Sequence, residues 1–274
     1  MRVGNAEVRS EGAVLDEAAE RVWWVHGEVA NKGTLPLAEV ERIVDPLEAA
    51  LDDRGPPSAL ARALAPADGY TTSHAISVAL LVMTLARHLA YDDEELRLVG
   101  TAALLHDLGK VRLPLSETPA EGLTAELRAA LERHPAEGAR VLLSAGERHA
   151  VSAIVAYEHH LPAAGDGGYP ARHYPRPPHR FSRLVRVCDT YDVLRRPRPY
   201  RPRLSHDAAL RYLEIQAGGT LDPELITAFA GMCGDRVPPR VADDAPGPEL
   251  GITELARMPD GPFDPDTETG TAVL

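Results

Sequence analysis

The amino-acid sequence predicts an all-helical fold, and three observations support this prediction. Ala and Leu are abundant and favour helix, whereas aromatic residues make up only 5% of the 274 residues. No alternating strand pattern precedes residue 235. Apolar residues recur with helical i, i+3, i+4 spacing, most clearly over 70–90 at Val78, Leu81, Val82, Leu85 and Leu89.

The same periodicity, read between turn-forming residues, sets the order of the expected helices. The expected helices span 14–30, 36–53, 58–64, 70–90, 93–107, 123–132, 135–145, 148–160, 181–194, 205–217 and 222–232. The acidic run Asp92-Asp93-Glu94-Glu95 favours the start of helix 93–107, because negative charge is stabilised at a helix N-terminus. Gly109 is a stop signal after that helix, and the Pro- and Gly-rich segment 161–180 is expected to be a loop.

These elements suggest three regions. Residues 1–33 form an N-terminal helical extension, 34–233 form the main helical domain, and 234–274 form a small irregular C-terminal appendage. Within the appendage, 235–258 has room for one or two short strands, and the polar tail from about 259 is expected to be disordered. The amphipathic N-terminal helix that carries Trp23-Trp24 is expected to pack on the domain, with homodimer formation as the alternative.

Composition excludes some classes of function. A net charge of −12 disfavours a nucleic-acid polymer as partner, since such proteins are usually basic. No apolar run reaches the length of a membrane span, and the N-terminus lacks an apolar signal core. Cys188 and Cys233 have no metal or redox spacing, which fits a reducing compartment. A cytoplasmic protein is expected, with regulation left to a partner protein or to the N-terminal segment.

Positive charge is concentrated in one segment. An arginine-rich segment in an acidic protein suits a small anionic ligand, although a solvated basic surface explains it equally well. Lysine is otherwise avoided: only Lys32 and Lys110 occur, which suggests a need for a compact ammonium group at Lys110. The segment 171–203 holds the arginines Arg172, Arg176, Arg180, Arg183, Arg186, Arg195, Arg196, Arg198, Arg201 and Arg203.

A set of histidines and aspartates falls in the most apolar helices. One such histidine alone is usually a satisfied core residue, but buried ionisable groups in this number are costly unless they are paired or bind metal. Imidazole and carboxylate without thiolate suit Zn, Mn, Fe or similar ions. Seven candidates exceed one tetrahedral site, and two ions sharing a carboxylate would use them all. The set is His74, His106, Asp107, His134, His159, His160 and Asp189.

Short motifs connect this set to a known family. Thr-Ala-Ala-Leu-Leu-His-Asp-Leu-Gly-Lys at 101–110 resembles the HD phosphohydrolase signature. In order and spacing, the motifs of 34–232 resemble the HD-GYP family of bacterial cyclic di-GMP phosphodiesterases, which implies an HD-superfamily helical bundle. The downstream motifs are His134-x-x-x-Gly138, His159-His160, Gly168-Tyr169-Pro170, Asp189-x-x-Asp192 and Arg198-Pro199-Tyr200-Arg201.

The resemblance implies a site and an activity. All seven candidates become metal ligands, with Asp107 bridging two divalent ions such as Fe or Mn. Asp107 and Lys110 are the implied catalytic residues, Lys110, Arg198 and Arg201 contact substrate phosphates, and Tyr169 lines the substrate pocket. Tyr70 stands where some members have a third-metal Glu, which favours two ions. Hydroxide formed between the ions would hydrolyse cyclic di-GMP to linear pGpG, to GMP, or to both.

The sequence also departs from the family pattern. Leu161 replaces the usual Glu after the paired histidines, the loop 162–170 has a shifted Asp-Gly, and Val193-Leu194-Arg195-Arg196 replaces Ala-Leu-Thr-Ser. Two alternatives therefore stay open: an HD-superfamily hydrolase acting on another nucleotide or cyclic dinucleotide, and a catalytically weak binding or interaction module. The histidines expected to be ordinary surface, packing or capping residues are His26, His88, His149, His173, His179 and His206.

Overall fold

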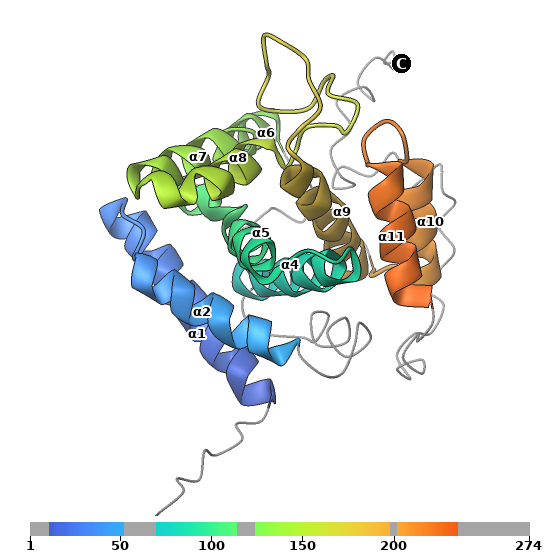
Figure 1. Ribbon diagram of the computed structural model, residues 1–274. Coiled ribbons are helices and arrows are strands. Elements are labelled where there is room, and N and C mark those ends of the chain that lie inside the picture. The colour runs from blue at the N-terminus through green and yellow to red at the C-terminus, as the bar shows by residue number, and fades with distance from the viewer. Residues whose placement is uncertain (1–10, 52–69, 114–123, 198–201, 235–274) are drawn as a thin grey trace, which may run out of the picture.

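The structure is a computed structural model that describes residues 11–51, 70–113, 124–197 and 202–234. Within these ranges all assigned elements are helices, apart from one isolated β-bridge between Ala217 and Leu221, which confirms the predicted all-α class (Figure 1). The expected helix 58–64 and everything expected beyond residue 234 lie outside the described residues. The elements are α1 (Glu11–Lys32), α2 (Leu37–Ala50), α4 (Tyr70–His88), α5 (Asp93–Leu105), η1 (Leu108–Arg112), α6 (Ala125–Leu131), α7 (His134–Ser144), η2 (Glu147–His149), α8 (Ala150–Glu158), α9 (Arg180–Arg195), α10 (His206–Ile215) and α11 (Pro223–Gly234).

Helices α4 and α5 pack against each other at the centre of the molecule (Figure 1). A capping box starts α5, since the Asp92 side chain accepts from Glu95 N at 2.8 Å and the Glu95 carboxylate accepts from Asp92 N. The end of α5 differs from the prediction. The helix stops at Leu105, and His106 N turns back to Ala103 O, so His106 and Asp107 lie in the tight turn that leads to η1.

Helices α7 and α8 pack together beside η1 (Figure 1). Gly109 makes this approach possible: a Cβ at this position would lie 1.9 Å from the carbonyl oxygen of His134 and 2.5 Å from Gly138 N. The expected helix 148–160 is instead a short 3-10 turn followed by α8, which ends at Glu158. His159 and His160 therefore follow the helix.

The N-terminal helices α1 and α2 cover one side of this centre (Figure 1). Helix α1 buries one stripe of apolar residues, Ala18, Val22, Val25 and Val29, and Arg112 of η1 donates to the carbonyl oxygens of Val29 and Ala30 at 3.4 and 3.3 Å. The expected packing of this helix on the domain is confirmed by its contacts with α4 and η1, although Trp23 and Trp24 are 72% and 44% exposed. They lie outside the buried stripe, so the valines hold the helix in place.

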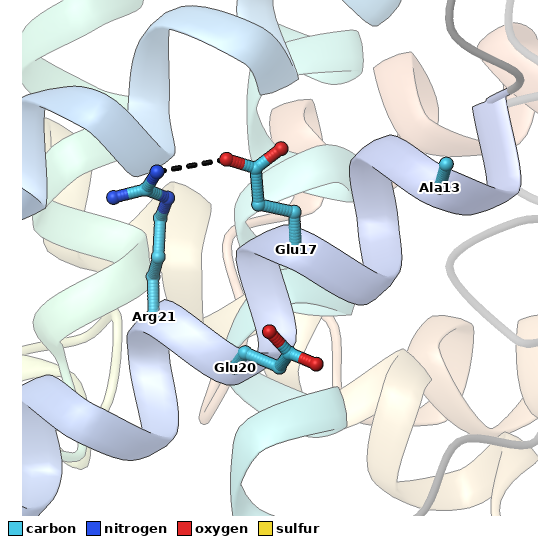
Figure 2. A pocket seen from close by; sticks show the side chains of 4 residues that line it. All are labelled: Ala13, Glu17, Glu20 and Arg21. Atoms are coloured by element: carbon cyan, nitrogen blue, oxygen red, sulfur yellow. Dashed lines mark hydrogen bonds and ion pairs between the residues drawn. The ribbon is translucent and has the colours of Figure 1, made fainter.

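A hollow of about 560 Å³ lies on the same helix. It is lined by Ala13, Glu17, Glu20 and Arg21, and Figure 2 shows the ion pair that Arg21 forms with Glu17 at 2.7 Å. None of the metal-ligand candidates lines it. This surface hollow is therefore separate from the predicted site.

Helix α9 runs beside α4, with α10 and α11 packed on its other side (Figure 1). The expected loop 161–180 connects α8 to α9, and His179 caps α9 by accepting from Phe181 N at 3.2 Å. Buried Glu158 fixes this junction, because it accepts from His179 N at 2.6 Å and from Ser182 Oγ at 3.1 Å. No helix among the described residues combines the length and apolarity needed to cross a membrane.

Candidate metal centre

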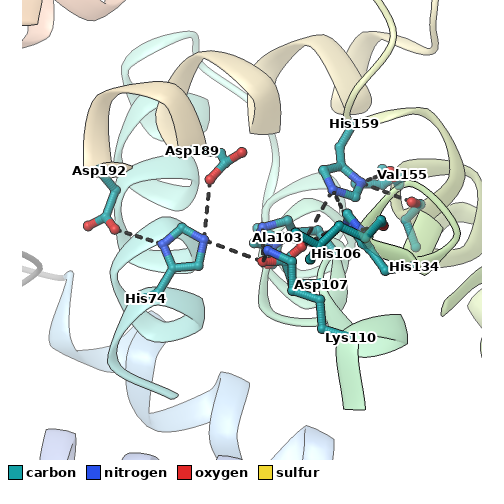
Figure 3. A network of polar contacts seen from close by, with 12 residues as sticks. His74, Ala103, His106, Asp107, Lys110, His134, Val155, His159, Asp189 and Asp192 are labelled. Atoms are coloured by element: carbon teal, nitrogen blue, oxygen red, sulfur yellow. Dashed lines mark hydrogen bonds and ion pairs between the residues drawn. The ribbon is translucent and has the colours of Figure 1, made fainter. Parts of the chain in front are cut away.

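Residues far apart in the sequence meet between α4, α5, α7, α8 and α9. His74 lies near the start of α4, His134 begins α7, and Asp189 lies in α9. His106 and Asp107 follow α5, and His159 and His160 follow α8. Figure 3 shows His74, His106, Asp107, His134, His159 and Asp189 pointing toward one another. The structure therefore brings the predicted ligand candidates into one region.

Asp107 lies at the centre of this cluster, and its two oxygens face different groups of histidines. Oδ1 lies 3.2 Å from His134 Nε2 and 3.6 Å from His159 Nε2. Oδ2 lies 3.6 Å from His74 Nε2 and 3.5 Å from His106 Nε2. We call Asp107, His134, His159 and His160 the α7–α8 group and His74, His106 and Asp107 the α4–α5 group; within each, the potential ligand atoms lie within 4.8 Å of one another. Asp107 belongs to both groups.

The histidine rings are held in the orientation that metal ligands need. Three of them use Nδ1 toward a backbone carbonyl: His106 toward Ala103 O at 2.7 Å, His134 toward Leu131 O at 2.6 Å, and His159 toward Ala156 O at 2.9 Å. A ring that donates from Nδ1 keeps the lone pair of Nε2 for a metal ion. The Nε2 lone pairs therefore point into the cluster.

The buried polar atoms of the cluster fit a divalent metal. In the described part of the chain, His106 Nε2, His160 Nε2 and Asp107 Oδ1 are buried without a hydrogen-bond partner. The Nε2 atoms of His134 and His159 also face each other at 3.2 Å, an arrangement of two acceptors that a shared cation would satisfy. Imidazole nitrogens with carboxylate oxygens are suitable donors for Zn, Mn or Fe. The cluster can therefore hold metal.

The protonation states of these side chains also favour metal binding. Burial lowers the pKa of His159 to about 4 and also lowers the pKa of His134 and of His160, so these rings are neutral at pH 7. Burial by itself would raise the pKa of Asp107, but the nearby charge of Lys110 and the surrounding histidines hold it well below its usual range. The cluster thus offers neutral imidazoles and an ionised carboxylate, the forms that bind metal.

His74 differs from the other histidines because a carboxylate from another helix holds its Nδ1. Asp192 Oδ2 lies 2.7 Å from Nδ1, and Asp189 Oδ1 lies 3.2 Å from Nε2 (Figure 3). Burial acts to lower the pKa of His74, but the nearby carboxylates of Asp107, Asp189 and Asp192 raise it well above its ordinary value. Asp192 is the second aspartate of the Asp189-x-x-Asp192 motif, and in the structure it holds His74 Nδ1.

The side of the cluster expected to bind substrate is partly described. Lys110, whose side chain is 33% exposed, places Nζ 2.6 Å from Asp107 Oδ2. The ring of Tyr169 stacks on His160, with 4.4 Å between ring centroids. Gly168 allows this approach: its φ is +71°, and a Cβ would lie 2.5 Å from His160 O. Arg198 and Arg201 lie outside the described residues.

The remaining histidines are placed more ordinarily, with one exception. His88 and His173 are exposed, His149 is buried, and His206 Nδ1 lies 2.7 Å from the Tyr191 hydroxyl. His26 of α1 is the exception: burial lowers its pKa to about 4, with opposing effects from the charges of Asp107 and His106. No sequence pattern connects His26 to the cluster; only the packing of α1 against η1 does.

Several characterised proteins are similar to this chain. A cyclic di-GMP phosphodiesterase of Pseudomonas aeruginosa is 30% identical over 83% of this chain and 55% of its own length. The cyclic di-GMP phosphodiesterase response regulator RpfG of Xanthomonas campestris is 34% identical over 63% of this chain and 46% of its own. A 3'3'-cGAMP-specific phosphodiesterase of Vibrio cholerae is 30% identical over 58% of this chain and 35% of its own. The chain spans about half the length of the first two.

The fold and the family agree with these similarities. An HDG"Y"P protein from Bdellovibrio bacteriovorus matches with a TM-score of 0.61 and 18% identity, covering 84% of this chain and 74% of that one, and so shares the fold. The family model described as "HD domain" matches residues 58–225, more than half of the sequence. The chain therefore belongs to the HD domain family, and its resemblance to the HD-GYP group is confirmed.

Proposed function

We propose that this chain is a metal-dependent phosphodiesterase that hydrolyses cyclic di-GMP to pGpG, to GMP, or to both. One observation carries the proposal: the two oxygens of Asp107 face two different histidine groups, which suits a carboxylate shared by two ions. Relatives named as cyclic di-GMP phosphodiesterases support the choice of substrate. The catalytic domain is proposed to span residues 34–233.

In this proposal two divalent ions, such as Fe or Mn, bind the seven candidate ligands. Asp107 would contribute to holding both ions, and Asp189, whose Oδ1 lies 3.2 Å from His74 Nε2, would contribute on the His74 side. When bound, such ions supply Lewis acidity, which lowers the pKa of water and polarises phosphate oxygens. The seven ligands are His74, His106, Asp107, His134, His159, His160 and Asp189.

The chain's own residues would bind and orient the substrate. Lys110 keeps a partly exposed ammonium beside Asp107, where it can stabilise negative charge on a phosphate oxygen. Tyr169, whose ring stacks on His160, is proposed to line the substrate pocket. Arg198 and Arg201 are proposed to hold a second phosphate, Arg198 through a bidentate contact.

A second candidate substrate is another cyclic dinucleotide. Two relatives from Vibrio cholerae, 30% and 28% identical to this chain, are named as 3'3'-cGAMP-specific phosphodiesterases. Tyr169, which is proposed to line the substrate pocket, lies within the altered loop 162–170. The two candidate substrates differ in one base, so the base preference of the site distinguishes them.

The test is a hydrolysis assay on the purified chain with Mn(II) or Fe(II), using cyclic di-GMP and 3'3'-cGAMP side by side. We expect faster hydrolysis of cyclic di-GMP, and loss of both metal content and turnover in Asp107→Ala. Asp16→Asn, which alters an exposed carboxylate of α1, is the matched control and should behave like the unaltered chain. Full activity in Asp107→Ala would overturn the assignment, and preference for 3'3'-cGAMP would select the second candidate.

A further inference from the structure

Arg196 is a buried arginine at the end of α9, and its bonds connect this helix to α4. Only 9% of the residue is exposed. Its Nε donates to Asp192 Oδ2 at 2.5 Å, while one terminal nitrogen donates to Ser73 Oγ at 3.1 Å. The other terminal nitrogen donates to Ser73 O at 3.1 Å and to Ser77 Oγ. A single guanidinium thus makes contact with three residues of two helices.

These contacts surround His74. The Asp192 oxygen that accepts from Arg196 is the same oxygen that lies 2.7 Å from His74 Nδ1. Figure 3 shows this contact between Asp192 and His74. Ser73 directly precedes His74, and Ser77 lies one turn later on α4. The guanidinium therefore fixes both the carboxylate that orients the imidazole ring and the part of the helix that carries it.

The ring of His74 depends on a side-chain contact for its orientation, unlike the rings of the neighbouring histidines. His106, His134 and His159 direct Nδ1 to carbonyl oxygens three residues earlier in the chain, so the orientation of each ring is set locally. The Nδ1 of His74 instead meets a side chain of α9, 118 residues away. Its ring orientation consequently depends on how Asp192 is held.

We infer that Arg196 is a positioning residue for the ion held by His74, His106 and Asp107, and not for the ion of the α7–α8 group. The inference rests on the proposed two-ion site. A buried carboxylate needs a fixed partner to direct a ring, and the planar guanidinium supplies several donors in one rigid arrangement. Removing such an outer partner typically weakens metal affinity about 10- to 100-fold.

The experiment measures Mn(II) bound per chain by equilibrium dialysis, without substrate. Arg196→Met should weaken one of two binding steps about 10- to 100-fold and leave the other within about twofold. The matched control is Arg183→Met, the same substitution on the same helix. Arg183 also pairs with a buried carboxylate, Asp222, but that carboxylate caps α11 and contacts no candidate ligand. We expect this control to leave both binding steps unchanged.

Two conservative variants separate positioning from general support of the fold. Arg196→Lys keeps the positive charge but loses the planar guanidinium with its several donors. It should weaken the same Mn(II)-binding step to a smaller degree. Ser77→Ala removes one acceptor, and keeps the inference testable if Arg196→Met does not fold. Unchanged binding in these variants, or equal weakening of both steps, overturns the inference. Two-step Mn(II) binding without hydrolysis would contradict the proposed activity alone, because this measurement needs no turnover.

Discussion

Gly109 lies in backbone contact with His134, so that the turn carrying Asp107 and the start of α7 share one small space. A methyl group on Gly109 would lie 1.9 Å from His134 O, and that oxygen belongs to backbone that cannot rotate away. The contact explains how His134 comes within 3.2 Å of Asp107. Glycine is therefore required here by the site as well as by the fold.

The first prediction is that Gly109→Ala lowers both stability and metal affinity. Moving η1 away from α7 costs about 1–3 kcal/mol of unfolding free energy, as overpacking usually does, and it separates Asp107 from His134. Gly27→Ala is the control, because no atom lies within 4 Å of the added methyl group on α1. It should raise stability by about 0.4–1 kcal/mol. Urea denaturation measures the unfolding free energy of each variant, and an equal change in the two variants would contradict the prediction.

The second prediction concerns Glu158, the buried carboxylate that directly precedes the paired histidines. It accepts from His179 N, Ser182 Oγ and Arg176, and Glu158→Gln replaces an acceptor by an amide that also carries donors. Leaving buried donors without a partner costs about 1–3 kcal/mol. Arg176→Ala removes only a partner whose side chain is 68% exposed, and should cost less than about 1 kcal/mol. Denaturation midpoints that rank the two variants in the opposite order would refute this.

The third prediction is a pH effect at His26. Its folded pKa of about 4 lies below the ordinary value of 6.5, so the unfolded chain binds the proton more readily. The resulting loss of folding stability is absent above about pH 6.5 and grows as the pH falls toward 4. Because His26 is partly exposed, we expect roughly 1 kcal/mol between pH 7.5 and 5. In metal-free protein the variant His26→Gln should lose this difference in unfolding free energy between the two pH values. The control variant His88→Gln, which changes an exposed histidine, should keep it.

The fourth prediction is that metal removal lowers thermal stability. Ions that bind only the folded chain stabilise it by about 2.7 kcal/mol at 100 times their Kd, which corresponds to a Tm rise of about 5–10 °C for a domain of this size. Chelation should reverse the rise, measured by circular dichroism. Asp107→Asn should not respond to Mn(II), and Asp16→Asn should respond fully. A metal-dependent rise in Asp107→Asn would show that Asp107 is not shared by the ions.

The sequence by itself determined the helical class, the order of the helices and the identity of the candidate ligands. Helical periodicity depends on neighbouring residues, and the motifs around His106-Asp107 and Gly168-Tyr169-Pro170 are short and contiguous, so both can be read without coordinates. Helix ends were less well determined. His106 and Asp107 were placed inside a helix, whereas they lie in the turn after it, because main-chain bonding at a helix end depends on the packing of the next segment.

Only the tertiary structure decided which oxygen of Asp107 faces which histidines, and which contacts lie behind each ring. Arg196 looked like a departure from a motif, and the fold placed it against Asp192 and Ser73. The sequence predicts an ordinary role for His26, whereas the packing of α1 against η1 places it near the charges of Asp107 and His106. Helix α1 packs on the domain through its valines, while Trp23 and Trp24 are exposed. The physical reason is common to these cases: burial and distance between helices are properties of the whole chain, and local sequence does not encode them.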